Sequence, residues 1–498
     1  MLFNSFQFLA FFPIVLIIYY AMPKLVKPYW LLIASYYFYM CWNAKYALLI
    51  LASTVITFIS GILIERIKNS DRLENRKLLL KKWVVAGSFI ANLGILFYFK
   101  YINFALDLIS GAFRCIGVQL NVPAFDIMLP VGISFYTFQA LSYTMDVYRD
   151  EIYAEKNFFR YALFVSFFPQ LVAGPIERSK NLLKQLAVYK KFDFDNFRDG
   201  FLLMIWGYFL KVVLADRIAV FVDTVYGDCV TYTGWYAAIA TMLFAVQIYC
   251  DFAGYSTIAM GAAKMLGINL MENFDAPYLS TSVAEFWRRW HISLTSWFKD
   301  YLYIPLGGSR KGKIRKQVNK LIVFLVSGLW HGADLSFVIW GGLNGLYQVI
   351  GDMLKPVRDR FVSVCGLNRD SLGHKILSGI ITFILVDFAW IFFRADGYQK
   401  AVEIIQSMFS QNNIWILFDE SLYECGLDGK NFTLMILAII VLLVADIFKR
   451  RGIRIRSVIA KQDYWCRCLI MIFAICFILI FGVWGSGYNA AGFIYFQF

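Results

Sequence analysis

The stretch "NKLIVFLVSGLWHGADLSFVIWGGLNGLYQ" (Asn319–Gln348) decides the fold class. It holds two apolar runs separated by a short break that follows His331. If a helix enters the membrane at Lys320, His331 lies 11 residues further along, about 16 Å deep at 1.5 Å per residue. That depth is near the middle of an apolar core about 30 Å thick. Because Gly332 follows at once, we expect the backbone to bend there, and irregular backbone at this depth must be buried in protein or line a cavity.

The composition agrees with a membrane protein. Hydrophobic residues make up 60% of the 498 positions and charged residues 16%, whereas about a quarter of an average globular chain is charged. Apolar runs such as Phe8–Tyr20, Ala47–Ile64 and Leu434–Val444 lie in segments that suit spanning helices, which need about 20 mostly apolar residues. The predicted fold class is an all-α polytopic membrane protein.

The basic residues lie in short loops between the expected spans, so the net charge of +14 is explained by the positive-inside rule and not by nucleic-acid binding. Arg66–Lys82 carries seven basic and two acidic residues. Ser309–Lys320 and Lys449–Lys461 carry six basic residues each and no acidic one, whereas Gln411–Lys430 carries four acidic residues and one basic. We expect the first three loops in the cytoplasm, and the acidic loop and both termini outside.

One continuous membrane domain is expected over residues 1–498, with about eleven spans and some shorter helices. Residues 128–350 hold the motifs described below, residues 400–491 an acidic outer segment and two helices, and residues 492–498 an aromatic tail. The expected spans, one of which is only half-inserted, begin near Leu2, Tyr29, Ala47, Trp83, Phe159, Gly200, Trp235, Leu321, Phe337, Ile376, Leu434 and Cys468.

His331 is the first candidate functional residue, because an ionisable side chain within a span is by default a functional hypothesis. With a pKa near 6.5, a histidine can take a proton from a hydroxyl and later return it, which is general-base chemistry. The structural alternative is a neutral histidine hydrogen-bonded between helices. His374, in a basic loop beside Lys375, is expected to be simply exposed.

A second stretch, Glu285–Gly308, is too polar for a lipid-facing span and too aromatic for an ordinary loop. On a helix at 100° per residue its aromatic side chains share one face, and a polar row lies on another. The pattern fits an interfacial helix with its aromatic residues in lipid, or one wall of a hydrated cavity; periodicity alone favours the interfacial helix. The polar row is Arg288, His291, Thr295 and Lys299.

Several kinds of chemistry find no support in the sequence. The nine cysteines form neither a CxxC pair nor a cluster with zinc spacing, so a disulfide framework and a metal site are not expected. No Ser/His/Asp set, GxSxG elbow or Walker-type loop is evident, which argues against a hydrolase or an ATP-driven pump. A basic face suits a phosphorylated donor on the cytoplasmic side, although the positive-inside bias explains it equally well. That face is Arg288, Arg289, Lys299, Arg310 and Lys311.

Two motifs carry a family resemblance. "FWRRWHISLTSWFKDYLYIPLGGSR" is followed, 40 residues after its histidine, by "LWHGADLSFVIWGGLNGL". Together they resemble the membrane-bound O-acyltransferase family, and more narrowly its bacterial alginate O-acetylase type, which is related to the teichoic-acid D-alanylation members. The likeness extends over nearly the whole chain, because Met128–Arg149, Phe167–Leu186 and Gln247–Ile268 agree as well.

The resemblance implies a ring of about eleven tilted transmembrane helices plus short re-entrant or interfacial helices. A funnel on each side would meet at the catalytic histidine. His331 matches the family's catalytic histidine and His291 its second active-site position, which favours the cavity-wall interpretation of Glu285–Gly308. Asp251 is either part of the pocket or a structural ion-pair partner. The residues expected to shape the pocket are Trp287, Arg288, Trp330 and Asp251.

The activity implied is transfer of an acetyl group from cytoplasmic acetyl-CoA, with no bound cofactor, to an extracytoplasmic polysaccharide. An SGNH-type transferase partner would deliver the group, and the protein would lie among the lipids of a bacterial inner membrane. His331 would act as general base and His291 would position the thioester carbonyl.

Alternatives remain open at this point. D-alanyl transfer to teichoic acid is one, although the residues from about 400 onward favour acetyl. A proton-coupled transporter or flippase is another, with Asp146, Asp251 and Asp387 as candidate relay groups. A non-catalytic scaffold is the third. The polymer is not named by the sequence: alginate, cellulose, peptidoglycan and other exopolysaccharides all fit.

The chain ends in "GFIYFQF", Gly492–Phe498, after a glycine-rich connection. Seven mostly apolar residues are too few to span a bilayer but enough to fold back into an outer funnel. By resemblance to a small companion protein of the D-alanylation systems, Tyr495 is predicted to accept the acyl group and pass it on. The alternative is an aromatic anchor at the membrane interface.

Overall fold

The computed structural model describes residues 1–120, 123, 125–172, 174–411, 413–484 and 494. Over these residues the regular structure is helical and no strand is present, which confirms the all-α class. The chain packs as two units: unit 1 holds Met1–Phe201 and Ala259–Met271, and unit 2 holds Leu202–Ile258 and Glu272–Phe498. Because α10 (Phe194–Tyr208) and α12 (Trp235–Met265) belong partly to each, the units share continuous helices. The single membrane domain over 1–498 stays a prediction.

Six helical segments in the described part of the chain are long and apolar enough to cross a bilayer, which identifies a membrane protein; the count of about eleven spans stays a prediction. Much of their apolar surface is exposed, and in Tyr464–Phe481 only 6% of the apolar stretch is buried. Such a surface requires lipid as its solvent. The segments are Ala44–Lys68, Glu74–Cys115, Trp235–Met265, Leu372–Arg394, Gly429–Arg450 and Tyr464–Phe481.

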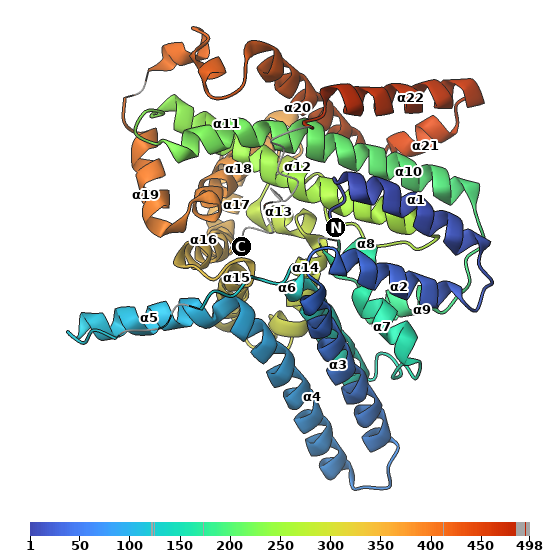
Figure 1. Ribbon diagram of the computed structural model, residues 1–498. Coiled ribbons are helices and arrows are strands. Elements are labelled where there is room, and N and C mark those ends of the chain that lie inside the picture. The colour runs from blue at the N-terminus through green and yellow to red at the C-terminus, as the bar shows by residue number, and fades with distance from the viewer. Residues whose placement is uncertain (121–122, 124, 173, 412, 485–493, 495–498) are drawn as a thin grey trace. The chain divides into compact units, whose positions relative to one another are not determined.

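In unit 1, α3 and α4 run side by side and are joined by a short turn (Figure 1). Ser53 Oγ donates a hydrogen bond to Asn92 Oδ1 at 2.6 Å between them, which satisfies two buried polar groups that lipid could not. The helices wholly within this unit are α1 (Phe6–Ala21), α2 (Lys27–Met40), α3 (Ala47–Lys68), α4 (Glu74–Leu96), α5 (Ile102–Cys115), α6 (Ile133–Tyr148), α7 (Phe158–Ser166), α8 (Phe168–Leu171) and α9 (Ser179–Leu186).

The span expected from Phe159 is replaced by two short helices, α7 and α8. The backbone of Phe167 leaves the helical region between them, at φ −53° and ψ 110°. Pro169 has no N–H to donate to the preceding turn, so it can begin a helix but cannot continue one. With 9 and 4 residues respectively, neither helix can cross a bilayer.

Unit 2 contains the hairpin of α15 and α16. α15 ends at His331 because Gly332 has extended backbone, at φ −155° and ψ 151°, which confirms the predicted bend. Asp334 then caps α16 by accepting the N–H of Ser336 at 2.7 Å. At the other end of the hairpin, Lys320 Nζ lies 2.7 Å from Asp352 Oδ2. The two helices are therefore antiparallel, and His331 stands at the turn.

The helices wholly within unit 2 precede and follow this hairpin in the sequence. Together with α15 (Lys313–His331) and α16 (Leu335–Met353), which form the hairpin, they are the π-helical segment η3 (Phe209–Ala215), α11 (Asp216–Gly227), α13 (Val283–Arg289), α14 (Ile292–Phe298), α17 (Lys355–Val364), α18 (Leu372–Arg394), α19 (Gly397–Met408), α20 (Gly429–Arg450), α21 (Ile455–Ala460) and α22 (Tyr464–Phe481). Two candidate spans, α20 and α22, lie in the C-terminal segment.

Candidate active site

The segment that carries His291 is a broken helix. The sequence pattern predicts one continuous amphipathic helix through Glu285–Gly308, and this prediction is wrong. α13 ends at Arg289, Trp290 is extended (φ −96°, ψ 129°) and His291 adopts left-handed backbone at φ +43° before α14 begins. The predicted polar row therefore does not exist as one face of a helix.

Asn273 provides the physical reason for this break. Its backbone carbonyl accepts the N–H of Ile292 at 2.9 Å, and its side-chain Oδ1 accepts the N–H of Ser293 at 3.2 Å. Asn273 Nδ2 in turn donates to Ser256 Oγ at 3.3 Å. The first N–H groups of a helix have no partner within that helix, and here a residue distant in sequence supplies the acceptors. The left-handed turn presents the imidazole of His291 inward.

The two histidines lie together in the interior of unit 2. Their ring centroids are 6.4 Å apart, and His291 is fully buried while His331 is 4% exposed. The ring of Trp330 lies 6.0 Å from that of His291 and 4.9 Å from that of His331. Residues from α13–α14 and from the tip of the α15–α16 hairpin thus form one constellation, as the two sequence motifs predict.

Aromatic rings enclose this pair. Phe252 of α12 packs edge-on against His291 at 4.6 Å. On the other side, His331 contacts Trp340 of α16 at 5.0 Å and Phe393 of α18 at 5.4 Å. Two of these rings, Phe252 of α12 and Phe393 of α18, come from helices outside the two histidine motifs, and Trp340 lies within the second motif. Phe252, Trp340 and Phe393 were missed by sequence reasoning, because buried aromatic residues are common in such a chain and carry no signal of their own.

Trp287 supports the wall from α13. It is 4% exposed, its Nε1–H donates to Asn344 Oδ1 at 3.0 Å, and its ring lies 5.6 Å from that of Trp340. A buried indole needs a partner for its N–H, and Asn344 provides it. Trp287 therefore fixes α13 against α16, next to the ring that contacts His331.

One residue of the predicted basic face, Arg289, is held in ion pairs. Arg288, Lys299, Arg310 and Lys311 are exposed, whereas Arg289 donates to Glu285 Oε1 at 3.0 Å, as does Arg450. Burial by itself would raise the pKa of Glu285, but hydrogen bonds from Thr281 and from these guanidinium groups lower its pKa to about 2. Arg289 thus holds α13 in place within unit 2 and is not presented to a donor.

Asp251 of α12 is a buried ion-pair partner. Its Oδ1 lies 2.6 Å from Lys211 Nζ, and the same ammonium group lies 2.8 Å from Asp216 Oδ1. Lys211 and Asp216 were not predicted as site residues, although a lysine in the apolar run Phe209–Ala215 is itself a signal. The ion pair expected as one alternative for Asp251 is therefore present, and its role in shaping the pocket stays a prediction.

The other two carboxylates considered for a proton path, Asp146 and Asp387, lie in different units. Asp146, in unit 1, accepts a hydrogen bond from Ser179 Oγ. Asp387, in unit 2, lies on α18 and is 9% exposed.

Tyr495, the predicted acyl acceptor, lies outside the described residues. Its neighbour Ile494 is described: it is 3% exposed, and its N–H donates to Asp251 Oδ2 at 2.8 Å.

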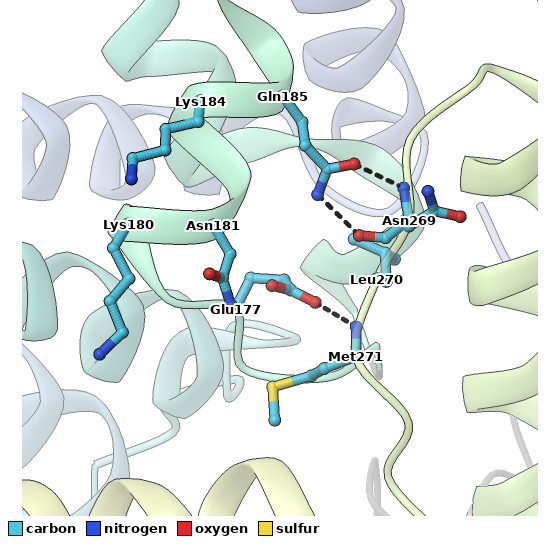
Figure 2. A pocket seen from close by; sticks show the side chains of 8 residues that line it. All are labelled: Glu177, Lys180, Asn181, Lys184, Gln185, Asn269, Leu270 and Met271. Carbon is cyan, nitrogen blue, oxygen red and sulfur yellow. Dashed lines mark hydrogen bonds between the residues drawn. The ribbon is translucent and has the colours of Figure 1, made fainter.

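A separate pocket lies in unit 1, between α9 and the extended chain at Asn269–Met271 (Figure 2). Its volume is about 410 Å³. Gln185 holds its wall through two hydrogen bonds of 2.8 Å to the backbone of Asn269, and Glu177 accepts the N–H of Met271. Lys180 and Lys184 project from one side of α9. Its lining contains no histidine, so this pocket is separate from the histidine pair in unit 2.

Comparison with known proteins places the two histidines within a family match. The model of the membrane-bound O-acyltransferase family matches residues 149–384, which include both histidines. The probable alginate O-acetylase AlgI of Pseudomonas aeruginosa is 37% identical over 441 residues, which cover 88% of this chain and 80% of that protein.

The names of two further relatives indicate other acceptors or acyl groups. A peptidoglycan O-acetyltransferase of Helicobacter pylori is 32% identical, over 83% of this chain and 81% of its own length. A teichoic acid D-alanyltransferase of Bacillus subtilis is 26% identical, over 56% of this chain and 72% of its own length. The chain is similar to the alginate and peptidoglycan proteins over most of their length, and the family model matches the region around the histidine pair. The chain therefore belongs to the membrane-bound O-acyltransferase family.

Proposed function

We propose that this protein transfers an acetyl group from cytoplasmic acetyl-CoA across a bacterial inner membrane for O-acetylation of an extracytoplasmic polysaccharide. The observation that carries the proposal is the pair of buried imidazoles, His291 and His331, with ring centroids 6.4 Å apart inside an aromatic wall. Acyl transfer needs a base for the attacking hydroxyl and a group that holds the carbonyl. Two histidines at this separation can serve both, since reacting atoms come within about 3 Å of each other.

In the proposed reaction, His331 takes the proton of the acceptor hydroxyl as its oxygen attacks the thioester carbon. The new C–O bond forms, the C–S bond breaks, and the CoA sulfur receives the proton from the imidazolium. His291 donates a hydrogen bond to the carbonyl oxygen, on which negative charge develops. The aromatic wall of Phe252, Trp340 and Phe393 excludes water, which would otherwise hydrolyse the thioester.

An acetyl group is favoured over a D-alanyl group as the transferred group, because similarity to the O-acetylating relatives extends over more of this chain. The relatives named as O-acetylating proteins are similar over 88% and 83% of this chain, whereas the named D-alanyltransferase is similar over 56%. The polymer remains open between alginate, peptidoglycan and other polysaccharides.

Tyr495 is proposed as the group that receives the acetyl first. A phenol with a pKa near 10 needs a base before it can attack a thioester, and His331 is the base in unit 2 assigned to that step. The acetylated tyrosine would then pass the group to an extracytoplasmic SGNH-type partner, which would acetylate the polysaccharide. Support comes from Ile494, its neighbour in the chain, which is buried within the unit that holds the histidines.

The test uses the purified protein in proteoliposomes with acetyl-CoA. Released CoA is measured by chromatography, and acetyl on the C-terminal peptide is measured by mass spectrometry. His331→Ala should lower the rate of CoA release at least about 100-fold, since general-base catalysis contributes roughly 10²–10⁴-fold. His374→Ala is the matched control, because only the backbone N–H of His374 is used, as a donor to the cap residue Ser371.

Each part of the proposal has its own contrary outcome. A His331→Ala protein that releases CoA at the wild-type rate would show that His331 is not the base. Tyr495→Phe keeps the ring and removes the hydroxyl, so it should abolish acetylation of the C-terminal peptide. If cells with Tyr495→Phe still acetylate their polysaccharide normally, the tail is an interface anchor and the acyl route lies elsewhere.

A further inference from the structure

Three charged side chains in the interior of unit 2 have no part in the proposed chemistry. Lys211 Nζ lies 2.6 Å from Asp251 Oδ1 and 2.8 Å from Asp216 Oδ1. The side chains of Lys211 and Asp251 are 1% and 3% exposed. Burying such charges costs several kcal/mol per ion, on the order of what their mutual attraction returns. Charged groups kept within a membrane protein are therefore expected to have a function.

The close approach of two helical segments brings these groups together. Lys211 lies in the π-helical segment η3, and such segments are frequent at functional sites. A Cβ atom at Gly254 of α12 would lie 3.0 Å from the backbone N of Lys211 and 2.8 Å from the carbonyl oxygen of Gly207. Only glycine permits that contact. Asp251, one helical turn before Gly254, is thereby placed opposite Lys211.

The cluster brings together two carboxylates and one ammonium group. A backbone N–H also binds one of these carboxylates: the N–H of Ile494 donates to Asp251 Oδ2 at 2.8 Å. A hydrogen bond to an ionised carboxylate is roughly twice as strong as one between neutral groups. Ile494 is itself 3% exposed, so both its backbone and its side chain are held inside the unit.

The same part of the chain also holds the end of the last helix. The N–H of Val483 donates to the carbonyl of Val212 at 2.9 Å. Arg217 donates to the carbonyl of Phe481, at the C-terminus of α22, at 2.7 Å. Both ends of the connection between α22 and the aromatic tail are therefore attached to η3 and its neighbours, one end directly and the other through Asp251.

This attachment point is connected to the histidine pair through α12. Asp251 precedes Phe252 on α12, and the ring of Phe252 packs against His291 at 4.6 Å. Tyr495 is the residue that follows Ile494 in the chain. We propose that Lys211, Asp216 and Asp251 form an anchor that holds the C-terminal tail at Ile494 in the interior of unit 2, and that Asp251 is the positioning residue of this anchor.

The consequence for catalysis rests on the proposed function, because only a tail that accepts an acyl group needs to be placed next to the histidines. The docking of Ile494 itself does not depend on that function. The competing explanation is that the three charges only fasten η3 to α12. In that case their loss would alter stability but would not change the exposure of the tail.

The experiment measures the exposure of the tail in the full-length protein in detergent micelles. Ile494→Cys introduces a thiol at the anchored position, and N-ethylmaleimide labelling of the C-terminal peptide is followed by mass spectrometry, which separates it from the native cysteines. In this background Asp251→Ala should raise the labelling rate at least about tenfold. Loss of a hydrogen bond to a charged group raises the population of the locally opened state by more than about a factor of ten. Asp251→Asn keeps the shape and an acceptor oxygen, so it should give a smaller rise.

The matched control is Asp446→Asn. Asp446 is also a buried carboxylate of unit 2, and it accepts a hydrogen bond from Tyr249 of α12, two residues before Asp251. Its loss should leave labelling of the introduced thiol unchanged. If Asp251→Ala does not yield folded protein, Asp251→Asn answers the same question. Unchanged labelling in the folded Asp251 variants would overturn the anchor, as would an equal rise in Asp446→Asn.

Turnover of acetyl-CoA, measured without the reporter thiol, separates the two proposals. Release of the tail should lower kcat and leave KM for acetyl-CoA within twofold, because the anchor does not bind the donor. Faster labelling of the introduced thiol together with an unchanged kcat would support the anchor and contradict the role of Tyr495 as acceptor.

Discussion

At the scale of single residues, the backbone of His291 is the most constrained feature of the site. Left-handed backbone costs a non-glycine residue about 1–2 kcal/mol, and His291 adopts it at φ +43°. Asn273 compensates by accepting the N–H groups of Ile292 and Ser293. The strain thus accompanies the placement of a ring that we propose to act in acyl transfer.

Asn273→Ala should therefore lower acetyl transfer without unfolding the protein. The substitution removes the bonds to Ser293 and Ser256, and a misplacement of 1 Å in a reacting group can cost about 100-fold in rate. We expect a 10- to 100-fold loss on that scale, measured as CoA release. Asn273→Asp, which keeps the acceptor oxygen, should recover part of the rate. Asn269→Ala is the control, since only the backbone of Asn269 bonds to Gln185. Equal losses in both variants would contradict the role of Asn273.

Glu177, in the pocket of unit 1, predicts a dependence of stability on pH. Burial raises the pKa of Glu177 to about 7 from its ordinary value of 4.5. A carboxyl group whose pKa is raised by folding stabilises the fold fully below its unfolded pKa, and this contribution is lost as the pH rises through its folded pKa. The wild-type protein should therefore lose up to about 3 kcal/mol between pH 4.5 and 7 through this group.

Glu177→Gln keeps the oxygen that accepts the N–H of Met271 and removes the titration. Its midpoint of thermal unfolding should match that of the wild type at pH 4 and exceed it at pH 8. Glu151→Gln, at an exposed carboxyl group that pairs with Lys180, should not reproduce this difference. A variant curve parallel to the wild type from pH 4 to 8 would show that Glu177 does not titrate there.

At the scale of elements, the α15–α16 hairpin holds His331 through contact between two helix backbones. A Cβ atom at Gly341 would lie 2.3 Å from the carbonyl oxygen of Phe324, which no side chain can tolerate without moving the helix. At the next position, Gly342, a Cβ atom would meet only the end of Leu325 at 3.6 Å, an ordinary contact.

Gly341→Ala should therefore destabilise the hairpin by about 1–3 kcal/mol, the usual cost of overpacking, and reduce transfer because His331 moves with α15. Gly342→Ala is the control, and it should be neutral or slightly stabilising, since alanine favours helix by up to about 1 kcal/mol over glycine. Tryptophan fluorescence on heating, together with CoA release, measures both effects. Equal behaviour of the two variants would show that close packing at Gly341 is not required.

At the scale of the whole molecule, the loop charges predict how the chain is oriented in the membrane. Within unit 1, Lys68 Nζ lies 2.7 Å from Asp150 Oδ1, and Lys180 Nζ lies 3.6 Å from Glu151 Oε2. The basic loop Arg66–Lys82, predicted to be cytoplasmic, therefore lies on the same side as α9 and its pocket. The acidic loop Gln411–Lys430 is predicted to face outside.

Labelling in intact cells with a membrane-impermeant maleimide tests this orientation. Asp71 and Asp419 are both exposed loop residues. Asp419→Cys should react from outside, and Asp71→Cys should react only after the membrane is permeabilised. Peptide mass spectrometry separates these sites from the nine native cysteines. The reverse labelling pattern would show that the predicted orientation of the protein is inverted, with the pocket of unit 1 on the outer side.

Local properties of the sequence are enough to predict the class, the orientation and the two histidines. These follow from local properties: hydrophobicity over about 20 residues, loop charge, and an ionisable residue within an apolar run. The helix break before His291 could not be predicted, because its cause, Asn273, acts through hydrogen bonds across a chain reversal. Periodicity instead favoured a continuous helix.

Which buried groups meet depends on how the helices pack, and no local property of the sequence gives it. Lys211 stood out in sequence as a charge in an apolar run, but nothing local could pair it with Asp251, 40 residues away on another helix. The same holds for Phe393 beside His331 and for the N–H of Ile494 on Asp251. Hydrogen bonds and ion pairs depend on distances of a few ångströms between elements, and those distances are set by how the helices pack.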